Sequence, residues 1–257
     1  MLKSVLKLLV ELTGNHYMSR ILAAFTASKY SKFLIPIYVA VYNVNKEEMR
    51  DGLASYPSLQ SLFTRHLKVD VRTIDQQTKS VVSPVDGIVS DYGTIKQATA
   101  VSVKGKELLI NELMGNDSKA DSYEGGSYIV IYLSPQHYHR IHSPVNGTII
   151  DSYTLGGKSY PVNKLGIKYG NRPLSTNYRR LTEIQTEYGK CALVKVGALN
   201  INSIQLTYKE SQLEKGQEVG YFSFGSTVIL LFVDRVSMNN LSIDQHVKVG
   251  ERISLFG

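Results

Sequence analysis

Short runs of β-branched and aromatic residues, separated by glycine and asparagine turns, fill the chain from about residue 80 onward. Each run has the length of a single strand, and turns such as Asn146-Gly147 are typical of connections between strands. The runs are Tyr128 to Leu133, Gly147 to Tyr153, Cys191 to Val196, Ile204 to Tyr208 and Val228 to Val233. This pattern predicts a body made mainly of β-structure and argues against a helical-repeat protein.

The first fifty residues follow a different pattern. They carry seven Lys and Arg against three acidic residues, and their apolar residues fall at helical spacing. The apolar positions on one face are Leu2, Val5, Leu6, Leu9 and Leu12. We therefore predict an α+β protein, with amphipathic helices in residues 1–80 followed by a β-rich, sandwich- or barrel-like body in residues 81–257.

An apolar stretch from Phe33 to Asn45 has no charged residue and contains Pro36. A helix that crosses a bilayer needs about 20 apolar residues, so this stretch is too short to span one. It is typical of a helix that lies at a membrane interface or packs on the protein's own core. A secretory signal is not expected, because Glu11 interrupts the apolar run behind the first lysines.

Composition narrows the class of partner. The chain of 257 residues is 43% hydrophobic, enough for a packed core, and its single cysteine, Cys191, excludes an internal disulfide framework. The net charge of +7 favours an anionic partner. No run of five basic residues and no basic-aromatic signature occurs, so nucleic acid is not the expected partner.

Three of the six histidines, His137, His139 and His142, lie between Pro135 and Pro144. Histidine moves protons near neutral pH and also binds metals. Three imidazoles and an open position could form a hydrolytic zinc site, and a turn between two prolines could also hold them for purely structural reasons. We expect proton transfer and no metal.

Two further features carry groups that could react. Asp86 lies in the turn Ser83-Pro84-Val85-Asp86-Gly87, although Asp before Gly is also common in ordinary turns. The stretch from Val219 to Val233 has no charge, which is typical of a buried strand, yet it contains the small triplet Gly225-Ser226-Thr227. A pure core strand would carry bulkier residues there.

Together, an aspartate, a histidine and a serine suggest a charge relay, in which histidine takes the serine proton and the carboxylate orients the imidazole. The chain has no Gly-x-Ser-x-Gly elbow, so an α/β-hydrolase is not expected. Gly157-Lys158-Ser159 is similar to the end of a phosphate loop, but Ser152 stands where that loop needs its first glycine.

In this order and context, these motifs resemble the phosphatidylserine decarboxylase family. The matching segments are Phe63-Thr64-Arg65, Ser83 to Gly87, Leu133 to Pro135, Tyr138 to Gly147, Pro161 to Asn163, Val196 to Ala198, Lys215 to Glu218 and Phe222 to Thr227. The chain departs from the pattern at His137, where an aspartate is common, at Tyr178 and at Ile201-Asn202. These departures do not affect the aspartate, the two candidate histidines or the serine.

The resemblance implies a specific reaction. His142, supported by Asp86, removes the proton of Ser226, and the serine oxygen attacks the carbonyl of Gly225. Cleavage between Gly225 and Ser226 then gives chains of residues 1–225 and 226–257, and Ser226 becomes a covalent pyruvoyl cofactor. A Schiff base to this group allows phosphatidylserine to lose CO2 and become phosphatidylethanolamine. His139 is a secondary candidate for the proton donor.

The resemblance also implies where the protein works. An anionic phospholipid substrate and basic helices suit a peripheral protein on the cytoplasmic face of the cell membrane. The alternatives are a non-catalytic lipid-binding protein and a pyruvoyl decarboxylase of a soluble amino acid. The sequence leaves the oligomeric state open, including a homo-oligomer.

Overall fold

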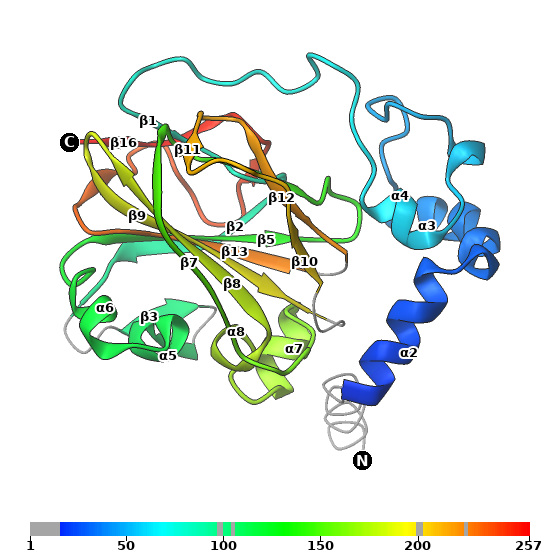
Figure 1. Ribbon diagram of the computed structural model, residues 1–257, viewed down its shortest axis with the longest axis horizontal. Coiled ribbons are helices and arrows are strands. Elements are labelled where there is room, and N and C mark those ends of the chain that lie inside the picture. The colour runs from blue at the N-terminus through cyan, green and yellow to red at the C-terminus, as the bar shows by residue number, and fades with distance from the viewer. Residues whose placement is uncertain (1–15, 97–99, 104–105, 199–202, 224–225) are drawn as a thin grey trace.

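A computed structural model of the chain describes residues 16–96, 100–103, 106–198, 203–223 and 226–257. Helices occupy its N-terminal part and strands dominate the remainder (Figure 1). The N-terminal helices are α2 (His16–Ala27), η1 (Lys29–Leu34), α3 (Ile35–Tyr42), η2 (Leu53–Ser55) and α4 (Leu59–Phe63). This arrangement confirms the predicted α+β class.

A large antiparallel sheet forms the centre of the body, with strand order β11-β7-β8-β9-β13-β5-β2-β15. Its strands are β2 (Gly87–Thr94), β5 (Ser127–Leu133), β7 (Gly147–Leu155), β8 (Arg179–Thr186), β9 (Gly189–Gly197), β11 (Gln212–Leu213), β13 (Ser226–Phe232) and β15 (His246–Val247). The end strands β11 and β15 do not pair with each other, so the sheet is open and is not closed into a barrel.

Smaller sheets accompany the large one. One has the order β1-β16-β14, another has the order β10-β12-β6, and β3 pairs with β4. Their bounds are β1 (Ser80–Val82), β3 (Ala100–Val103), β4 (Lys106–Leu109), β6 (Arg140–His142), β10 (Ile204–Leu206), β12 (Glu218–Phe222), β14 (Val236–Ser237) and β16 (Arg252–Phe256). Every strand predicted from the sequence falls on an observed one, and the run predicted to reach Tyr208 ends as a strand at Leu206.

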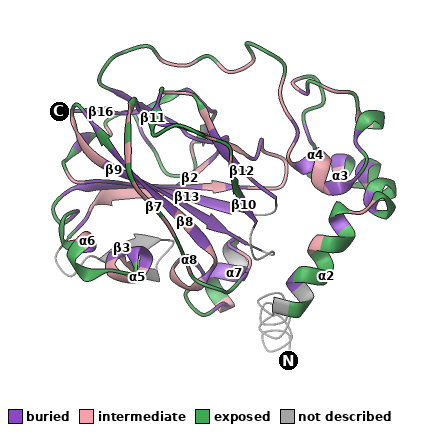
Figure 2. Ribbon diagram, viewed as in Figure 1, coloured by how far each residue is buried: buried purple, intermediate pink, exposed green. Residues whose placement is uncertain are grey.

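Both faces of the large sheet are covered. On β13, Val228 and Leu230 belong to a core that also contains residues of β1, β6, β10, β12 and β16, whereas Ile229 and Leu231 belong to a core shared with helices. Successive residues of a strand point to opposite faces, so β13 is buried on both sides and reads as a continuous apolar run. Figure 2 shows this burial along β13 and along most of β9.

Short helices supply the cover of the second face. They are α5 (Ile110–Met114), α6 (Asp117–Asp121), α7 (Lys164–Tyr169) and α8 (Pro173–Thr176). The sequence analysis did not predict them, because four to six residues are too few to show a 3.6-residue period. Individual residues mark the ends of two of these helices. Gly115 ends α5 in the left-handed region at φ 69°, and the Asn116 side chain caps the start of α6 by accepting the Lys119 N–H.

The N-terminal helices form a small core of their own. Ile35 and Val39 of α3 pack with Leu59 and Leu62 of α4, whereas Val41 on the other side of α3 is 69% exposed. The Ser58 side chain begins α4 in a capping box. The stretch predicted as interfacial or core-packing therefore has one buried and one exposed side. Among the described residues, no helix is long and apolar enough to cross a membrane.

Candidate active site

Ser226 is the first residue of β13 and lies between two neighbours, with Leu133 of β5 opposite it on one side and Gly197 of β9 on the other. It is fully buried, and its Oγ has no hydrogen-bond partner among the described residues. An unsatisfied buried hydroxyl costs roughly 1–3 kcal/mol of folding free energy. Such a group in a core strand indicates a functional role more than a structural one.

His139 is the second buried group with an unsatisfied atom. Its ring stacks on Phe63 of α4 with centroids 3.8 Å apart, and its Nδ1 lies 2.8 Å from the carbonyl oxygen of His137. Because a carbonyl only accepts, Nδ1 carries the hydrogen and Nε2 keeps a lone pair that meets no partner in the described part of the chain. Burial and then the charge of Arg65 lower the pKa of His139 well below its ordinary value, so the ring is neutral.

His139 is also tied to the strand that leads to Ser226. Its carbonyl oxygen accepts the N–H of Phe222, the last residue of β12, at 2.9 Å. Three residues, 223–225, lie between β12 and β13, and the last two are outside the described residues, so the predicted cleavage position between Gly225 and Ser226 is described only in part. Ser226 itself is described.

His142 differs from His139 in that both of its ring nitrogens are engaged. Its Nδ1 lies 2.7 Å from the carbonyl oxygen of Gly216, and its Nε2 lies 3.2 Å from the hydroxyl of Tyr138. Burial lowers the pKa of His142, partly opposed by the hydrogen bond to Gly216. To take a proton from Ser226, His142 would have to exchange the Tyr138 hydroxyl at Nε2 for the hydroxyl of Ser226.

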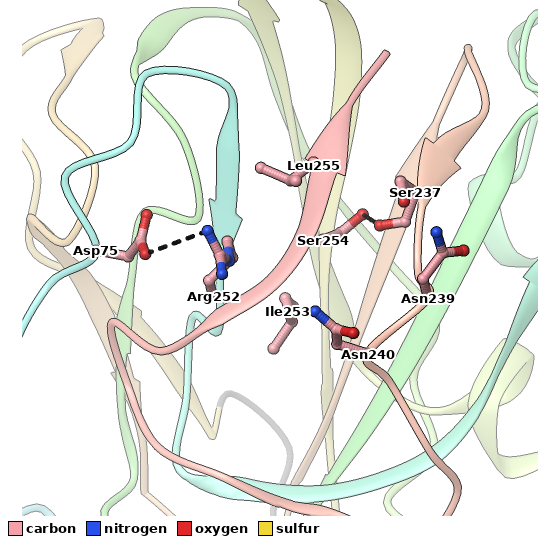
Figure 3. Close-up of a pocket in the computed structure, with 8 residues that line it drawn as sticks. All are labelled: Asp75, Ser237, Asn239, Asn240, Arg252, Ile253, Ser254 and Leu255. Atoms are coloured by element: carbon pink, nitrogen blue, oxygen red, sulfur yellow. Dashed lines mark hydrogen bonds and ion pairs between the residues drawn. The ribbon is translucent and has the colours of Figure 1, made fainter.

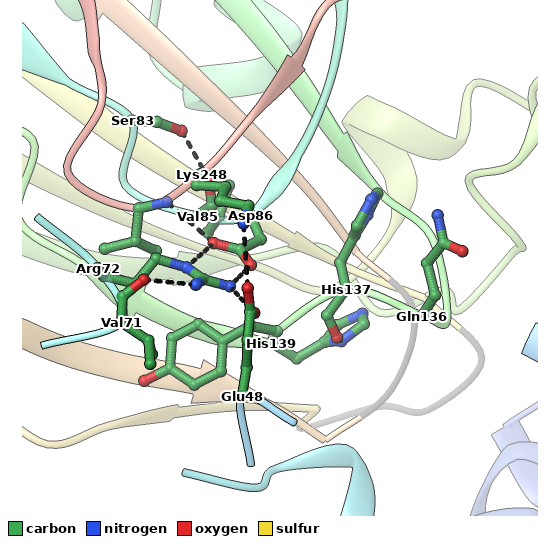
Figure 4. Close-up of polar contacts among 12 residues, drawn as sticks. Glu48, Val71, Arg72, Ser83, Val85, Asp86, Gln136, His137, His139 and Lys248 are labelled. Carbon is green, nitrogen blue, oxygen red and sulfur yellow. Dashed lines mark hydrogen bonds and ion pairs between the residues drawn. The ribbon is translucent and has the colours of Figure 1, made fainter. Parts of the chain in front are cut away.

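Asp86 is held by an arginine (Figure 4). Arg72 donates to both carboxylate oxygens, Nε to Oδ1 at 3.0 Å and Nη2 to Oδ2 at 2.5 Å, and Val249 donates its backbone N–H to Oδ1 at 2.9 Å. Arg72 also binds Glu48 at 2.7 Å. Burial opposes the charge of Arg72, but these hydrogen bonds outweigh it and raise the pKa of Arg72 above its ordinary value.

The backbone brings two of the predicted relay residues close together. The N–H of His142 donates to the carbonyl of Pro84, two residues before Asp86, at 2.8 Å. In the described conformation, however, the hydrogen bonds of Asp86 go to Arg72 and Val249, and those of His142 go to Gly216 and Tyr138. The predicted relay therefore remains a prediction that needs a rearrangement of side chains.

His137 takes no part in a shared ligand set. Its Nδ1 accepts the backbone N–H of Ser134 at 3.0 Å, and burial lowers its pKa to about 4. Across the described residues, no group of three or more histidine, cysteine, aspartate or glutamate side chains is arranged to hold a metal ion. The zinc alternative therefore finds no ligand set in this part of the chain.

The N-terminal helical part directly contacts the loop that carries the histidines. Arg65 Nη2 donates to the carbonyls of Gln136 at 2.8 Å and His137 at 3.0 Å, and the hydroxyl of Tyr38 donates to the carbonyl of Pro135 at 2.7 Å. Together with the stacked ring of Phe63, these contacts fix the loop. The sequence offered Phe63-Thr64-Arg65 only as a motif and gave no sign of this role, and it gave none for Arg72.

Two surface cavities lie elsewhere. One, of about 320 Å³, lies beside β14 and β16, where Arg252 approaches Asp75 to 4.0 Å and Ser254 donates to the carbonyl of Ser237 (Figure 3). The other, of about 360 Å³, includes Glu187 and Tyr188 in its wall. Neither is lined by Ser226 or by the candidate histidines, so the buried polar atoms mark the site better than the cavities do.

Comparison with known proteins identifies the family. The model of the phosphatidylserine decarboxylase family matches residues 59–254, a segment that includes all the candidate side chains. The chain belongs to the phosphatidylserine decarboxylase family. It is 49% identical to the phosphatidylserine decarboxylase proenzyme of Geobacillus sp. (strain WCH70), with 98% of each chain covered. It is 47% identical to the proenzyme of that name from Halalkalibacterium halodurans, again with 98% of each covered.

Membership of the decarboxylase family confirms two predictions, the resemblance itself and the assignment to an enzyme of the carboxy-lyase class. The relatives are named as proenzymes, which implies a precursor that is converted into the active form. The roles of the individual side chains are not part of those names. Those roles remain predictions from the resemblance.

Proposed function

We propose that this chain decarboxylates phosphatidylserine to phosphatidylethanolamine, using a pyruvoyl group that it makes from its own Ser226. The observation that carries the proposal is the buried hydroxyl of Ser226, which has no partner among the described residues and lies at the start of a strand without charge. The relatives' shared name supports the substrate. The protein would act as a precursor of residues 1–225 and 226–257.

The self-cleavage needs a nucleophile that is also a β-leaving group. The Ser226 oxygen attacks the carbonyl carbon of Gly225, the peptide C–N bond breaks, and an ester replaces the amide. Loss of the α-proton of residue 226 then expels the Gly225 carboxylate, leaving a dehydroalanine that tautomerises to an imine. Water converts the imine to the pyruvoyl carbonyl and releases ammonia.

The site suits a prosthetic group made at this position. A pyruvoyl group is uncharged, so no charged side chain is needed beside residue 226. The strands on both sides, β5 and β9, bury this position and exclude water from it. Once formed, the pyruvoyl carbonyl supplies an electron sink of the kind that pyridoxal phosphate supplies in other enzymes. The chain's own residues must therefore bind the substrate amine next to residue 226 and move protons there.

We assign the proton transfer in decarboxylation to His139. Its neutral ring and free Nε2 lone pair can accept a proton and return it to the substrate carbon. We keep Asp86 and His142 as the pair that activates Ser226 in the precursor. In that role His142 would exchange Tyr138 for Ser226 at Nε2 and the carbonyl of Gly216 for Asp86 at Nδ1.

We further propose that the N-terminal helices bind an anionic membrane surface on the cytoplasmic side of the cell. Of the twelve large hydrophobic side chains that are exposed within the described ranges, nine lie between residues 17 and 42. They are Tyr17, Ile21, Leu22, Phe25, Tyr30, Phe33, Ile37, Val41 and Tyr42. Arg20, Lys29 and Lys32 lie in the same segment, which suits a lipid surface with negative headgroups. Residues 1–15, with the predicted apolar face from Leu2 to Leu12, are outside the described residues.

The decisive experiment measures the mass of the purified chain and its release of CO2. We expect two fragments, with the smaller one blocked by pyruvoyl at its amino terminus, and CO2 from phosphatidylserine in detergent micelles. Ser226→Ala should give one uncleaved chain and no CO2. CO2 from free serine alone would replace the lipid substrate with a soluble amino acid, and an uncleaved, inactive wild-type chain would leave only a lipid-binding role.

A further inference from the structure

Ser203 is a third buried residue with an unsatisfied polar atom. It directly precedes β10 and is fully buried, and its Oγ has no partner among the described residues. Its backbone carbonyl accepts the N–H of Ser223 at 2.7 Å, which fixes its position beside the segment that leads to Ser226. The motifs singled out in the sequence do not include Ser203.

Gly197 shows where the Ser203 hydroxyl lies. A Cβ added at position 197 would collide with Ser203 Oγ, so the hydroxyl occupies the space that a side chain of β9 would fill. The register of β9 and β13 places Gly197 directly opposite Ser226. Side chains of directly opposite residues lie on the same face, with Cβ atoms about 4.5–5.5 Å apart. The Ser203 hydroxyl therefore lies on the same face of the sheet as the Ser226 side chain, at the Gly197 position opposite it, and in the described structure the two hydroxyls are not hydrogen-bonded to each other.

The core residues show that β10 covers the face of the sheet to which the Ser226 side chain points. Val228 and Leu230, which follow Ser226 at strand spacing, belong to the core that also contains Ile204, the neighbour of Ser203. His139 joins them through its carbonyl, which accepts the Phe222 N–H one residue before Ser223. Ser203, Ser226 and His139 are thus each joined through the backbone to the end of β12 or the start of β13.

We propose that Ser203 is a further catalytic residue of self-cleavage, whose O–H donates a hydrogen bond to the Ser226 oxygen as that oxygen loses its proton. A donor aimed at developing negative charge is strongest in a site without water. This inference rests on the proposed self-cleavage and adds a residue to it. It explains why a fully buried hydroxyl is kept beside a glycine that makes room for it.

The test is the rate of self-cleavage, followed by gel and mass after a pulse of cell-free synthesis. We expect Ser203→Ala to slow cleavage at least about tenfold, and Ser203→Cys, which keeps a weak donor of similar size, to cleave faster than the alanine variant. Because Ser203→Ala removes a group without a partner, its unfolding midpoint should equal or exceed that of wild type.

The matched control is Ser127→Ala at the far end of β5. Ser127 is equally buried, but its Oγ accepts the N–H of Val236 at 3.1 Å, so this variant should lose stability and cleave at the wild-type rate. Wild-type cleavage by Ser203→Ala would overturn the inference. Slow cleavage together with a fall in the unfolding midpoint like that of Ser127→Ala would also overturn it, because the effect would then be structural.

A second pair of variants tests the geometry without any activity. Gly197→Ala should lower the unfolding midpoint because the new methyl meets the Ser203 hydroxyl. Adding Ser203→Ala should restore much of the loss, since Ser203 Cβ lies 3.6 Å from the position of the new methyl, an ordinary contact. If Ser203→Ala does not restore the unfolding midpoint of Gly197→Ala, the placement of the Ser203 hydroxyl is overturned. Failure of wild type to cleave would be seen before any variant and would overturn the proposed function itself.

Discussion

The N-terminal helices and the β body use apolar side chains in opposite ways. In the body they fill two cores on the faces of one sheet, so that β13 is buried along its whole length. In the helical part, Ile35 and Val39 are buried but Phe33 and Val41 next to them are exposed. The body therefore buries its apolar side chains on both faces of the sheet, whereas the helices have one side that contacts the histidine loop and another side that is exposed.

The largest effect is expected in the body, at the two histidines. His139→Gln should leave a chain that cleaves but whose kcat for CO2 release falls about 10²–10⁴-fold, because proton transfer is lost. His142→Gln should instead remain uncleaved. Fragment masses and CO2 from phosphatidylserine micelles measure both. Cleavage by His142→Gln together with an uncleaved His139→Gln would exchange the two roles.

The next effect tests the inner side of the helical part. In Arg65→Lys the amine cannot reproduce the contacts of the guanidinium with the carbonyls of Gln136 and His137, so the loop shifts. We expect kcat to fall about 10- to 100-fold with a smaller change in KM. Arg50→Lys is the matched control, because Arg50 is exposed and pairs only with Asp51 in the described structure. Equal kcat values for the two variants would mean that the helices do not position the loop.

A smaller effect is expected on the outer side. Phe33→Ser combined with Val41→Ser removes two exposed apolar side chains, each worth roughly 1.5–3 kcal/mol when fully buried. Partition onto vesicles containing phosphatidylserine, measured by sedimentation, should fall about tenfold or more. Val69→Ser with Ile243→Ser removes exposed apolar groups outside the helices and should leave partition unchanged. Equal losses in both pairs would show that the helices are not the membrane-binding surface.

The smallest effect concerns the core of the body. Lys195 on β9 is fully buried, with its Nζ donating to Thr182 Oγ1 at 2.7 Å, and burial together with Arg180 lowers its pKa to about 7. In the unfolded chain the pKa is about 10.4, so between pH 7 and 10 the unfolded state binds more protons and stability rises with pH.

Lys195→Met should remove this rise and increase the unfolding midpoint at pH 7, by about 2–4 °C for each kcal/mol regained. Thermal unfolding of both proteins from pH 7 to 10 measures the difference. If the unfolding midpoints of wild type and Lys195→Met change equally with pH, the Lys195 amine is charged in the folded state.

Much of the fold could be predicted from the sequence, because apolar residues recur at regular spacing along strands and amphipathic helices. The charge-free run around Ser226 and the strands from Tyr128, Gly147 and Cys191 were found in this way. The helices α5 to α8 were not, because each has fewer than two turns. The candidates Asp86, His139 and Ser226 came from motifs, and all three prove to be buried.

The sequence by itself determined which residue types are available at the site, since a motif needs only neighbours along the chain. Only the tertiary structure decided how they meet. Arg72 binds Asp86, and Arg65 binds the histidine loop. In the part of the chain that is described, one ring nitrogen of His139 has no partner, whereas both ring nitrogens of His142 have one. Strand register sets Gly197 opposite Ser226, and the Ser203 hydroxyl occupies the space that a side chain at position 197 would fill. Such contacts join residues far apart in sequence, and no local pattern records them.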